Sequence, residues 1–251
     1  MITRSVTFWI YLVILGVLLA LLTPSKIIAK NLLLGFKQGN DSDLIPEGWE
    51  LITYAGTPKN KMSTYVEEKR TVIKMESLGS ASGILKRQAV DLKEFPVLAW
   101  RWKINRVVGM AIESRKDRND SAARVRVIFG KERGKHIEWA PEISKFLKSL
   151  GLQINSGEPK GFKIDYIWGS NVHKGHVFDY PGSKNHKIIV VESGNERTNK
   201  WIWEKQDLIK DFRQFFGGIP HFLTGALVLT DTDDTNEGVT AYYSSFVMMN
   251  K

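Results

Sequence analysis

An acidic segment near the C-terminus holds the densest set of side chains that could do chemistry. Its sequence is Thr230-Asp-Thr-Asp-Asp-Thr-Asn-Glu-Gly, and its carboxylates are Asp231, Asp233, Asp234 and Glu237. Ca²⁺ takes about six to eight oxygen ligands, and closely spaced carboxylates with turn carbonyls supply such ligands. The segment lacks the helices and the spacing of an EF-hand, so it predicts an irregular Ca²⁺ site. Ca²⁺ is the one candidate cofactor that the sequence suggests.

Two structural roles compete with cation binding in this segment. Asp and Asn side chains commonly cap backbone amides in turns. Alternatively, Asp231 or Asp233 pairs with one of the basic residues Arg101, Arg124 and Arg126 in a partly buried ion network. The sequence gives the order of these residues but not their distances, so it leaves the three roles open.

A carboxylate at the end of an apolar run suggests a second chemistry. Glu192 follows Ile188-Ile-Val-Val and could join Asp231 or Asp233 as the carboxylate pair of a polysaccharide hydrolase or lyase. A glutamate at a strand end more commonly pairs with an arginine, so we expect a binding protein rather than an enzyme. The chain contains no nucleophile elbow, P-loop or dinucleotide fingerprint, and the absence of cysteine excludes thiolate chemistry.

Basic residues are concentrated in the middle of the chain. The net charge is +9, and residues 101–135 hold much of the excess. In the strand pattern from Leu98 to Ile104, Arg101 faces away from the two tryptophans, and Arg124 and Arg126 share one side of a later strand. We therefore expect Arg101, Arg124 and Arg126, with Glu192 nearby, to form a basic face that binds an anionic ligand. A solvated surface without a ligand is the alternative.

Aromatic residues suggest a platform for sugar rings, because aromatic faces bury the apolar faces of pyranoses. We expect Trp168 and Tyr242 to contribute to such a platform. Trp201 and Trp203 share one side of a short alternating segment and form a further candidate. Core packing is expected to take most of the remaining rings.

The elements that must position these residues are mostly short strands. Alternation and turn residues predict strands at 49–54, 71–76, 83–89, 98–104, 123–129, 163–168, 187–192, 225–230 and 239–248, and helices at 141–150 and 206–216. Few helices separate the strands, which argues against a parallel α/β sheet. We predict an all-β fold, an antiparallel jelly-roll-like β-sandwich with two short helices, over residues 48–251.

The N-terminal part of the chain predicts export. An apolar run from Val6 to Leu22 follows Arg4 and is near the lower limit for spanning a bilayer. We expect residues 1–30 to form a signal anchor or a signal peptide, with an uncleaved transmembrane helix favoured because Ile27 suits a signal peptidase poorly. Residues 31–47 are expected to form a stalk. The body is then periplasmic or otherwise extracytoplasmic, anchored to the inner membrane.

Several motifs of the body together resemble one family. They are Phe95-Pro-Val-Leu-Ala-Trp-Arg-Trp-Lys-Ile, Ala122-Ala-Arg-Val-Arg-Val-Ile-Phe, Tyr166-Ile-Trp, Val190-Val-Glu-Ser-Gly, Asp211-Phe-Arg-Gln-Phe-Phe-Gly and Leu229-Thr-Asp-Thr-Asp-Asp-Thr-Asn-Glu. In this order they resemble the DUF3047 family of bacterial exported proteins. The resemblance implies a periplasmic or surface β-sandwich and no particular activity. The segment Pro141 to Gly161 is longer than this family leads us to expect.

These observations together predict a membrane-tethered extracytoplasmic domain that binds a glycan or an anionic envelope polymer without catalysis. A carboxylate-dependent polysaccharide hydrolase or lyase is one alternative. A scaffold subunit that meets a protein partner in an envelope complex is another. Nucleic acid is not an expected partner, because no recognised binding motif accompanies the basic residues.

Overall fold

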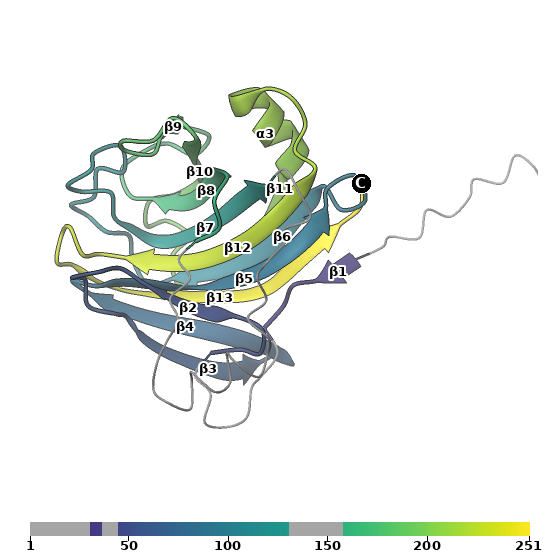
Figure 1. Cartoon of the computed structure of the whole chain (residues 1–251). Helices are drawn as coiled ribbons and strands as arrows, with labels where there is room; N and C mark the ends of the chain where they lie inside the picture. The colour runs from purple at the N-terminus through teal and green to yellow at the C-terminus, as the bar shows by residue number, and fades with distance from the viewer. Residues whose placement is uncertain (1–30, 37–44, 131–157) are drawn as a thin grey trace, which may run out of the picture. The chain divides into compact units, whose positions relative to one another are not determined.

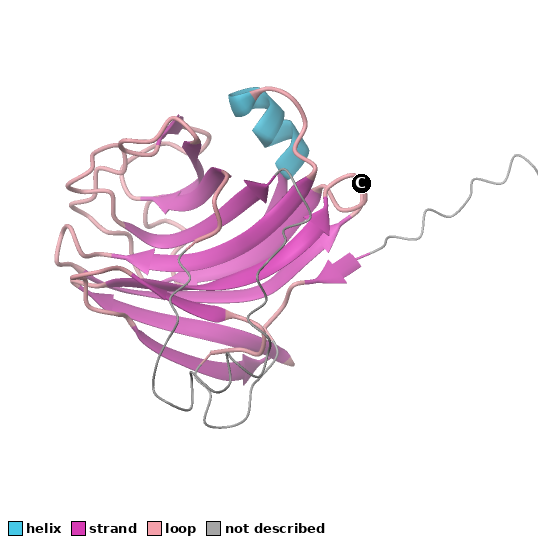
Figure 2. Cartoon of the chain, viewed as in Figure 1, coloured by secondary structure: helices cyan, strands magenta, loops and turns pink. Residues whose placement is uncertain are grey.

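Two β-sheets packed face to face make up the described part of the protein. The computed structural model describes residues 31–36, 45–130 and 158–251. Strands dominate this part, and its one helix lies near an end of the sheets (Figures 1 and 2). The expected helix at 141–150 and the expected N-terminal helix lie outside the described residues. No helix among the described residues has the length and apolar character needed to cross a membrane.

Sheet A has six strands, all paired antiparallel. Its main path runs β11 (Ile202–Asp207), β6 (Val97–Ile104), β13 (Gly238–Met249), β4 (Arg70–Leu78) and β3 (Lys61–Glu67), and β1 (Asn31–Leu33) pairs with the end of β13.

Sheet B has seven strands. Its order is β2 (Glu50–Thr53), β5 (Ala81–Asp91), β12 (Phe222–Asp231), β7 (Ser121–Gly130), β8 (Phe162–Gly169), β10 (His186–Ser193) and β9 (Val177–Asp179). The pairing of β8 with β10 is parallel, which corrects the expectation of a purely antiparallel sandwich. The reason is the segment between them: the chain returns along the edge as β9, antiparallel to β10, before β10 begins.

The nine expected strands all occur, as β2, β4, β5, β6, β7, β8, β10, β12 and β13. The expected helix at 206–216 is α3 (Leu208–Phe216). Asp207 caps its first turn by accepting a hydrogen bond from the Lys210 amide at 3.1 Å, and the chain leaves it at Gly217, whose φ of 70° suits glycine. The apolar face of α3 packs on sheet B, where Phe212 lies 5.0 Å from Phe129 between ring centroids.

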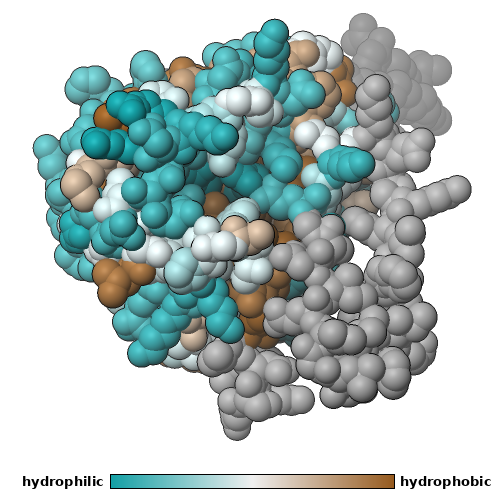
Figure 3. Space-filling model, turned by 60° about the vertical axis from the view of Figure 1, so that its left-hand side comes forward, coloured by the Kyte–Doolittle hydropathy of each residue, from teal (hydrophilic) through white to brown (hydrophobic). Residues whose placement is uncertain are grey.

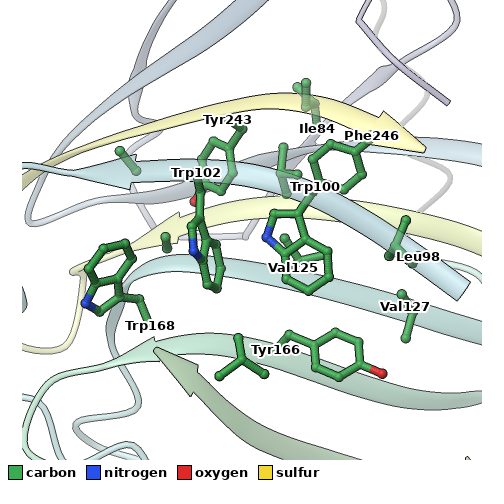
Figure 4. Packing of buried hydrophobic residues seen from close by; sticks show 14 of the residues in the cluster. Ile84, Leu98, Trp100, Trp102, Val125, Val127, Tyr166, Trp168, Tyr243 and Phe246 are labelled. Carbon is green, nitrogen blue, oxygen red and sulfur yellow. The ribbon is translucent and has the colours of Figure 1, made fainter. Parts of the chain in front are cut away.

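The core between the sheets is rich in aromatic rings (Figure 4). Trp100 and Trp102 of β6 project from sheet A, and their ring centroids lie 5.6 Å from Tyr166 and 5.9 Å from Trp168 of sheet B, respectively. All four side chains are fully buried. Trp168 is therefore a core residue, which corrects its expected role in ligand binding.

The first residues of the segment expected as a stalk belong to the sandwich. β1 pairs with β13, and the Leu34 and Phe36 side chains that follow it are buried. The Phe36 ring lies 4.7 Å from Trp49 and 5.5 Å from Phe246. The sandwich therefore begins at Asn31, while residues 37–44 lie outside the described part.

Candidate functional site

The outer face of sheet B, the face turned away from the core, carries buried charges. Alternation along β7 turns Val125 and Val127 toward the core and Arg124 and Arg126 outward. On the neighbouring strand β8, Asp165 lies directly opposite Arg126. Arg124 and Asp165 are nevertheless 0% exposed, and Arg126 is 5% exposed. Charges on an outer face of a sheet normally meet water, so other parts of the chain must cover these.

These side chains form a continuous chain of ion pairs, which we call the charge network. Arg126 donates two hydrogen bonds to the Asp165 carboxylate, from Nε to Oδ1 at 2.7 Å and from Nη2 to Oδ2 at 2.8 Å. Arg124 donates from Nη1 to Asp165 Oδ2 at 2.9 Å. Arg126 also donates to Glu158 at 2.5 Å, and Lys163 donates to the second oxygen of Glu158 at 2.6 Å. Every member therefore has an oppositely charged partner.

The charge network keeps its carboxylates ionised. Burial raises the pKa of Asp165, but the charge and hydrogen bonds of Arg126, together with the contact to His186, outweigh burial and hold this pKa well below its usual range. Burial likewise works against the Glu158 carboxylate, yet Arg126 and Lys163 lower its pKa. Taking charges out of water is costly even when they are paired, so a network of five charged groups, three of them buried, is a candidate for function rather than for stability alone.

A cleft of about 430 Å³ opens beside the charge network. This volume falls in the usual range for small-ligand sites, roughly 300–1,000 Å³. Its lining combines two tyrosines with charged and polar groups: Ile52, Thr53, Tyr54, Arg126, Glu158, Lys163, Tyr180 and His186. The molecular surface seen in Figure 3 is largely hydrophilic, with small hydrophobic areas between the polar side chains.

Tyr180 covers the cationic part of the cleft. Its ring stacks on His186 with centroids 4.2 Å apart and planes within 3°, and it lies 5.5 Å from the Arg126 guanidinium carbon. His186 Nε2 lies 2.8 Å from Asp165 Oδ1. Burial lowers the pKa of His186, and Asp165 only partly offsets this, so the imidazole is neutral at pH 7.

The expected single basic face does not exist, because its members lie in different sheets. Arg124 and Arg126 belong to β7 of sheet B, whereas Arg101 belongs to β6 of sheet A. On the outer face of sheet A, Arg101 lies with Tyr242, and the Trp201 ring covers its guanidinium at 4.3 Å. Each outer face thus combines cations with an aromatic ring, Arg101 with Trp201 on sheet A and Arg126 with Tyr180 on sheet B, which the sequence analysis did not predict.

The expected Ca²⁺ set is also divided. Glu237 turns toward another loop, where it accepts hydrogen bonds from the Met110 amide at 2.7 Å and from Arg106 at 2.8 Å. Ligand oxygens of Asp233 and Asp234 lie within 4.8 Å of one another and of Asp120, a residue that the sequence did not suggest. Asp120 and Asp234 also accept hydrogen bonds from backbone amides across the two loops. This supports the turn-capping role for part of the segment.

Asp231 ends β12 beside the charge network. Burial raises the pKa of its carboxyl well above the usual range, and Arg124 offsets this only in part. The expected ion network is not formed, because among the described residues the ion-pair partners of Arg101, Arg124 and Arg126 are Glu68, Asp165 and Glu158 rather than Asp231 or Asp233.

The structure does not bring Glu192 together with Asp231 or Asp233. Glu192 lies opposite Trp168 and so points to the core side, where Arg197 donates to it at 2.6 Å. Asp231 lies three strands away, about 14 Å at the usual strand spacing, on the opposite face of sheet B. The carboxyl groups of glycosidase pairs are about 5 to 9.5 Å apart, so this pair does not fit glycoside hydrolysis.

Sequence reasoning missed most of the residues around the cleft. Asp165 interrupts a strongly apolar strand, and its alternation with Lys163 was a usable signal for an outward polar face. Glu158, Tyr180 and His186 come from loops or strand ends, and only the folded chain brings them to the strand of Asp165.

Sequence reasoning also missed Glu204, which belongs to β11 of sheet A and does not line the cleft. Burial raises the pKa of its carboxyl to about 7, and the neighbouring Glu192 adds to this rise.

Three solved structures with a similar fold are distant in sequence. An endoglucanase, cel12A from Rhodothermus marinus, aligns with 10% identity over 81% of this chain and 92% of its own, with a TM-score of 0.44. A family 12 xyloglucanase from Bacillus licheniformis aligns with 8% identity over 89% and 100%, with a TM-score of 0.43. A family 29 carbohydrate-binding module complexed with cellulohexaose aligns with 9% identity over 89% and 93%, with a TM-score of 0.35. At these TM-scores the likenesses carry no argument about a ligand.

Sequence comparison gives the family. No curated protein matches this chain. The model of the family described as "Protein of unknown function (DUF3047)" matches residues 47–247, which include every strand from β2 to β12, most of β13 and the whole charge network. That match confirms the resemblance seen in the motifs, and the chain belongs to the DUF3047 family.

Proposed function

We propose that this protein binds a glycan of the cell envelope in the cleft on the outer face of sheet B. One observation carries the proposal: two tyrosines and five charged or polar side chains line an open cleft of about 430 Å³ beside a fixed charge network. Aromatic rings bury the apolar faces of sugars, while positioned charged and polar groups bind their hydroxyls. The charge network holds its side chains rigidly and so reduces the entropy lost on binding.

The same geometry supports binding without catalysis. A general acid at neutral pH needs a proton to donate, but the cations beside Asp165 and Glu158 lower the pKa of both carboxyls. Asp165 is further occupied by hydrogen bonds from Arg124 and Arg126. The cleft therefore offers hydrogen-bonding groups in fixed positions rather than a free acid and base.

The cellular place of this binding is part of the proposal and comes from the sequence. The apolar run at residues 6–22 supports an N-terminal tether with the body outside the cytoplasm, where envelope glycans are found. Protease added to spheroplasts should digest the body while the membrane stays intact. Protection of the body until the membrane is lysed contradicts this placement.

A glycan array with the detergent-purified full-length protein tests the binding itself. We expect retention on a subset of glycans, and Tyr180→Ala should weaken it up to about tenfold, because aromatic stacking contributes about 0.5–1.5 kcal/mol. His221→Ala, which removes an exposed aromatic ring that does not line the cleft, is the control and should bind as the wild type does. Absence of binding across neutral and anionic glycans, with the protein folded, overturns the proposal. Equal loss in both variants also overturns it.

A further inference from the structure

The outer face of sheet A carries a second group of aromatic and cationic side chains, on the side of the sandwich opposite the cleft. Direct pairing across the strands places Trp203 opposite Arg101 and Tyr242 opposite Lys103, so all four share this face. Trp201, which precedes β11, lies over the same two cations. We call these five residues the aromatic-cation patch.

Lys103 is held between two rings. Its Nζ lies 4.8 Å from the Trp201 ring centroid and 4.5 Å from that of Tyr242, and the two rings meet edge to face at 6.5 Å. Within the described ranges no carboxylate lies within 4.0 Å of this ammonium group. The nearby Lys74, in contrast, pairs with Glu76 at 2.9 Å. Lys103 is therefore a positioned cation without a counter-ion.

Arg101 is the buried member of the patch, and two of its guanidinium nitrogens lack a hydrogen-bond acceptor among the described residues. The residue is 4% exposed, and in the described structure its Nε and Nη2 donate to no partner. Buried guanidinium donors are normally satisfied, as those of Arg124 are on the other sheet. An unpaired buried donor is costly, so a ligand that reaches Arg101 and accepts a hydrogen bond from it recovers part of this cost.

Glu68 shows that a carboxylate can reach Arg101. Its side chain is 63% exposed, and it accepts one hydrogen bond from Arg101 Nη1 at 3.2 Å. Glu68 Oε2 also lies 3.4 Å from the exposed Arg70 guanidinium, so Glu68 keeps a cationic partner when another carboxylate replaces it at Arg101. Glu67, the second acid of this turn, is engaged by the Trp201 indole at 3.2 Å.

We propose that the aromatic-cation patch is a second binding site, for a saccharide that bears a carboxylate. The carboxylate takes the place of Glu68 at Arg101 and pairs with Lys103, since charge-assisted hydrogen bonds to carboxylates are the strong ones. The sugar ring packs against Trp203, the one large aromatic side chain of the patch that is more than half exposed, at 55%. This site shares no residue with the cleft and does not rest on the function proposed for it.

Titration calorimetry with the full-length protein tests the site, with oligogalacturonate, its methyl ester and inorganic phosphate as probes. The acid form should bind at least tenfold more tightly than the ester. Lys103→Met and Trp203→Ala should each weaken the acid form about tenfold, and Trp203 is exposed enough for its loss to leave the fold intact. Glu68→Gln should tighten binding, because it removes the competing carboxylate.

The control is Lys187→Met, which removes a lysine of sheet B that pairs with Asp179 at the surface and should leave binding unchanged. Equal affinity for acid and ester overturns the proposal, as does weaker binding in Glu68→Gln. Phosphate that binds as tightly as the oligosaccharide shows a general anion site and also overturns it. Loss of binding in Tyr180→Ala, but not in Lys103→Met, assigns the ligand to the cleft instead.

Discussion

Asp165 is the residue on which the charge network depends. It neutralises two arginines that are almost fully buried, and each has lost its hydration on folding. Removing one partner of a buried ion pair leaves the other charge uncompensated, which is much more costly than removing the whole pair.

Asp165→Asn should therefore lower the free energy of unfolding by about 3–5 kcal/mol, measured by urea denaturation at pH 7. Asp179→Asn is the control: Asp179 is an aspartate of the same sheet whose side chain is 60% exposed, paired with Lys187. That change should cost less than about 1 kcal/mol. Similar costs for the two variants argue against a buried ionised network.

Glu204 makes the opposite contribution to stability. Its carboxyl is buried beside Glu192, and burial raises its pKa from 4.5 to about 7. Between these values the folded state holds a proton that the unfolded state has released, so stability falls as pH rises from about 4.5 to 7.

Glu204→Gln should remove this loss. We expect the variant to be more stable than the wild type at pH 8, by at most about 3 kcal/mol since each pKa unit corresponds to about 1.4 kcal/mol, and nearly equal to it at pH 4. Thermal unfolding at the two pH values measures the difference. A variant that is equally or less stable at pH 8 contradicts the raised pKa of Glu204.

At the scale of elements, β1 and the residues after it are part of the core. Phe36 fills a gap between Trp49 and Phe246 and is 8% exposed, whereas Leu33 of β1 is 74% exposed. Phe36→Ala should lower the free energy of unfolding by about 3–5 kcal/mol, while Leu33→Ala should change it little. Denaturant unfolding of the two variants compares these free energies. A small effect of Phe36→Ala contradicts a place for this segment in the core and supports the expected stalk.

Sequence patterns predicted the strands whose two faces differ clearly. In β6, alternation of Trp100 and Trp102 with Arg101 and Lys103 indicated a core face and a polar face, and the structure confirms both. The strands β3 and β11 escaped prediction, because they are sheet edges whose polar and charged residues hide the alternation.

The candidate site was harder to predict, because it depends on which strands share a sheet. Arg101 and Arg124 have the same strand pattern, and nothing in their local sequence shows that β6 and β7 lie in different sheets. The partners of Arg126 come from β8 and from Glu158, far along the chain. Such pairings follow from the long-range register of the sheets, which local periodicity does not encode.

At the scale of the whole sandwich, the two sheets share one hydrophobic core. Trp100 and Trp102 from sheet A interlock with Tyr166 and Trp168 from sheet B, so neither sheet keeps its core when the other unfolds (Figure 4). The cleft and the aromatic-cation patch therefore lie on opposite sides of one cooperative unit.

The sandwich should accordingly unfold in a single transition. Tryptophan fluorescence, which reports on the core, and far-UV circular dichroism, which reports on the strands, should give the same Tm. Because a ligand that binds only the folded state stabilises the whole unit, a ligand at 100 times its Kd should add about 2.7 kcal/mol to the unfolding free energy, whichever face it occupies. Two separate transitions, of which a ligand shifts only one, contradict the shared core and show that each sheet supports its own site.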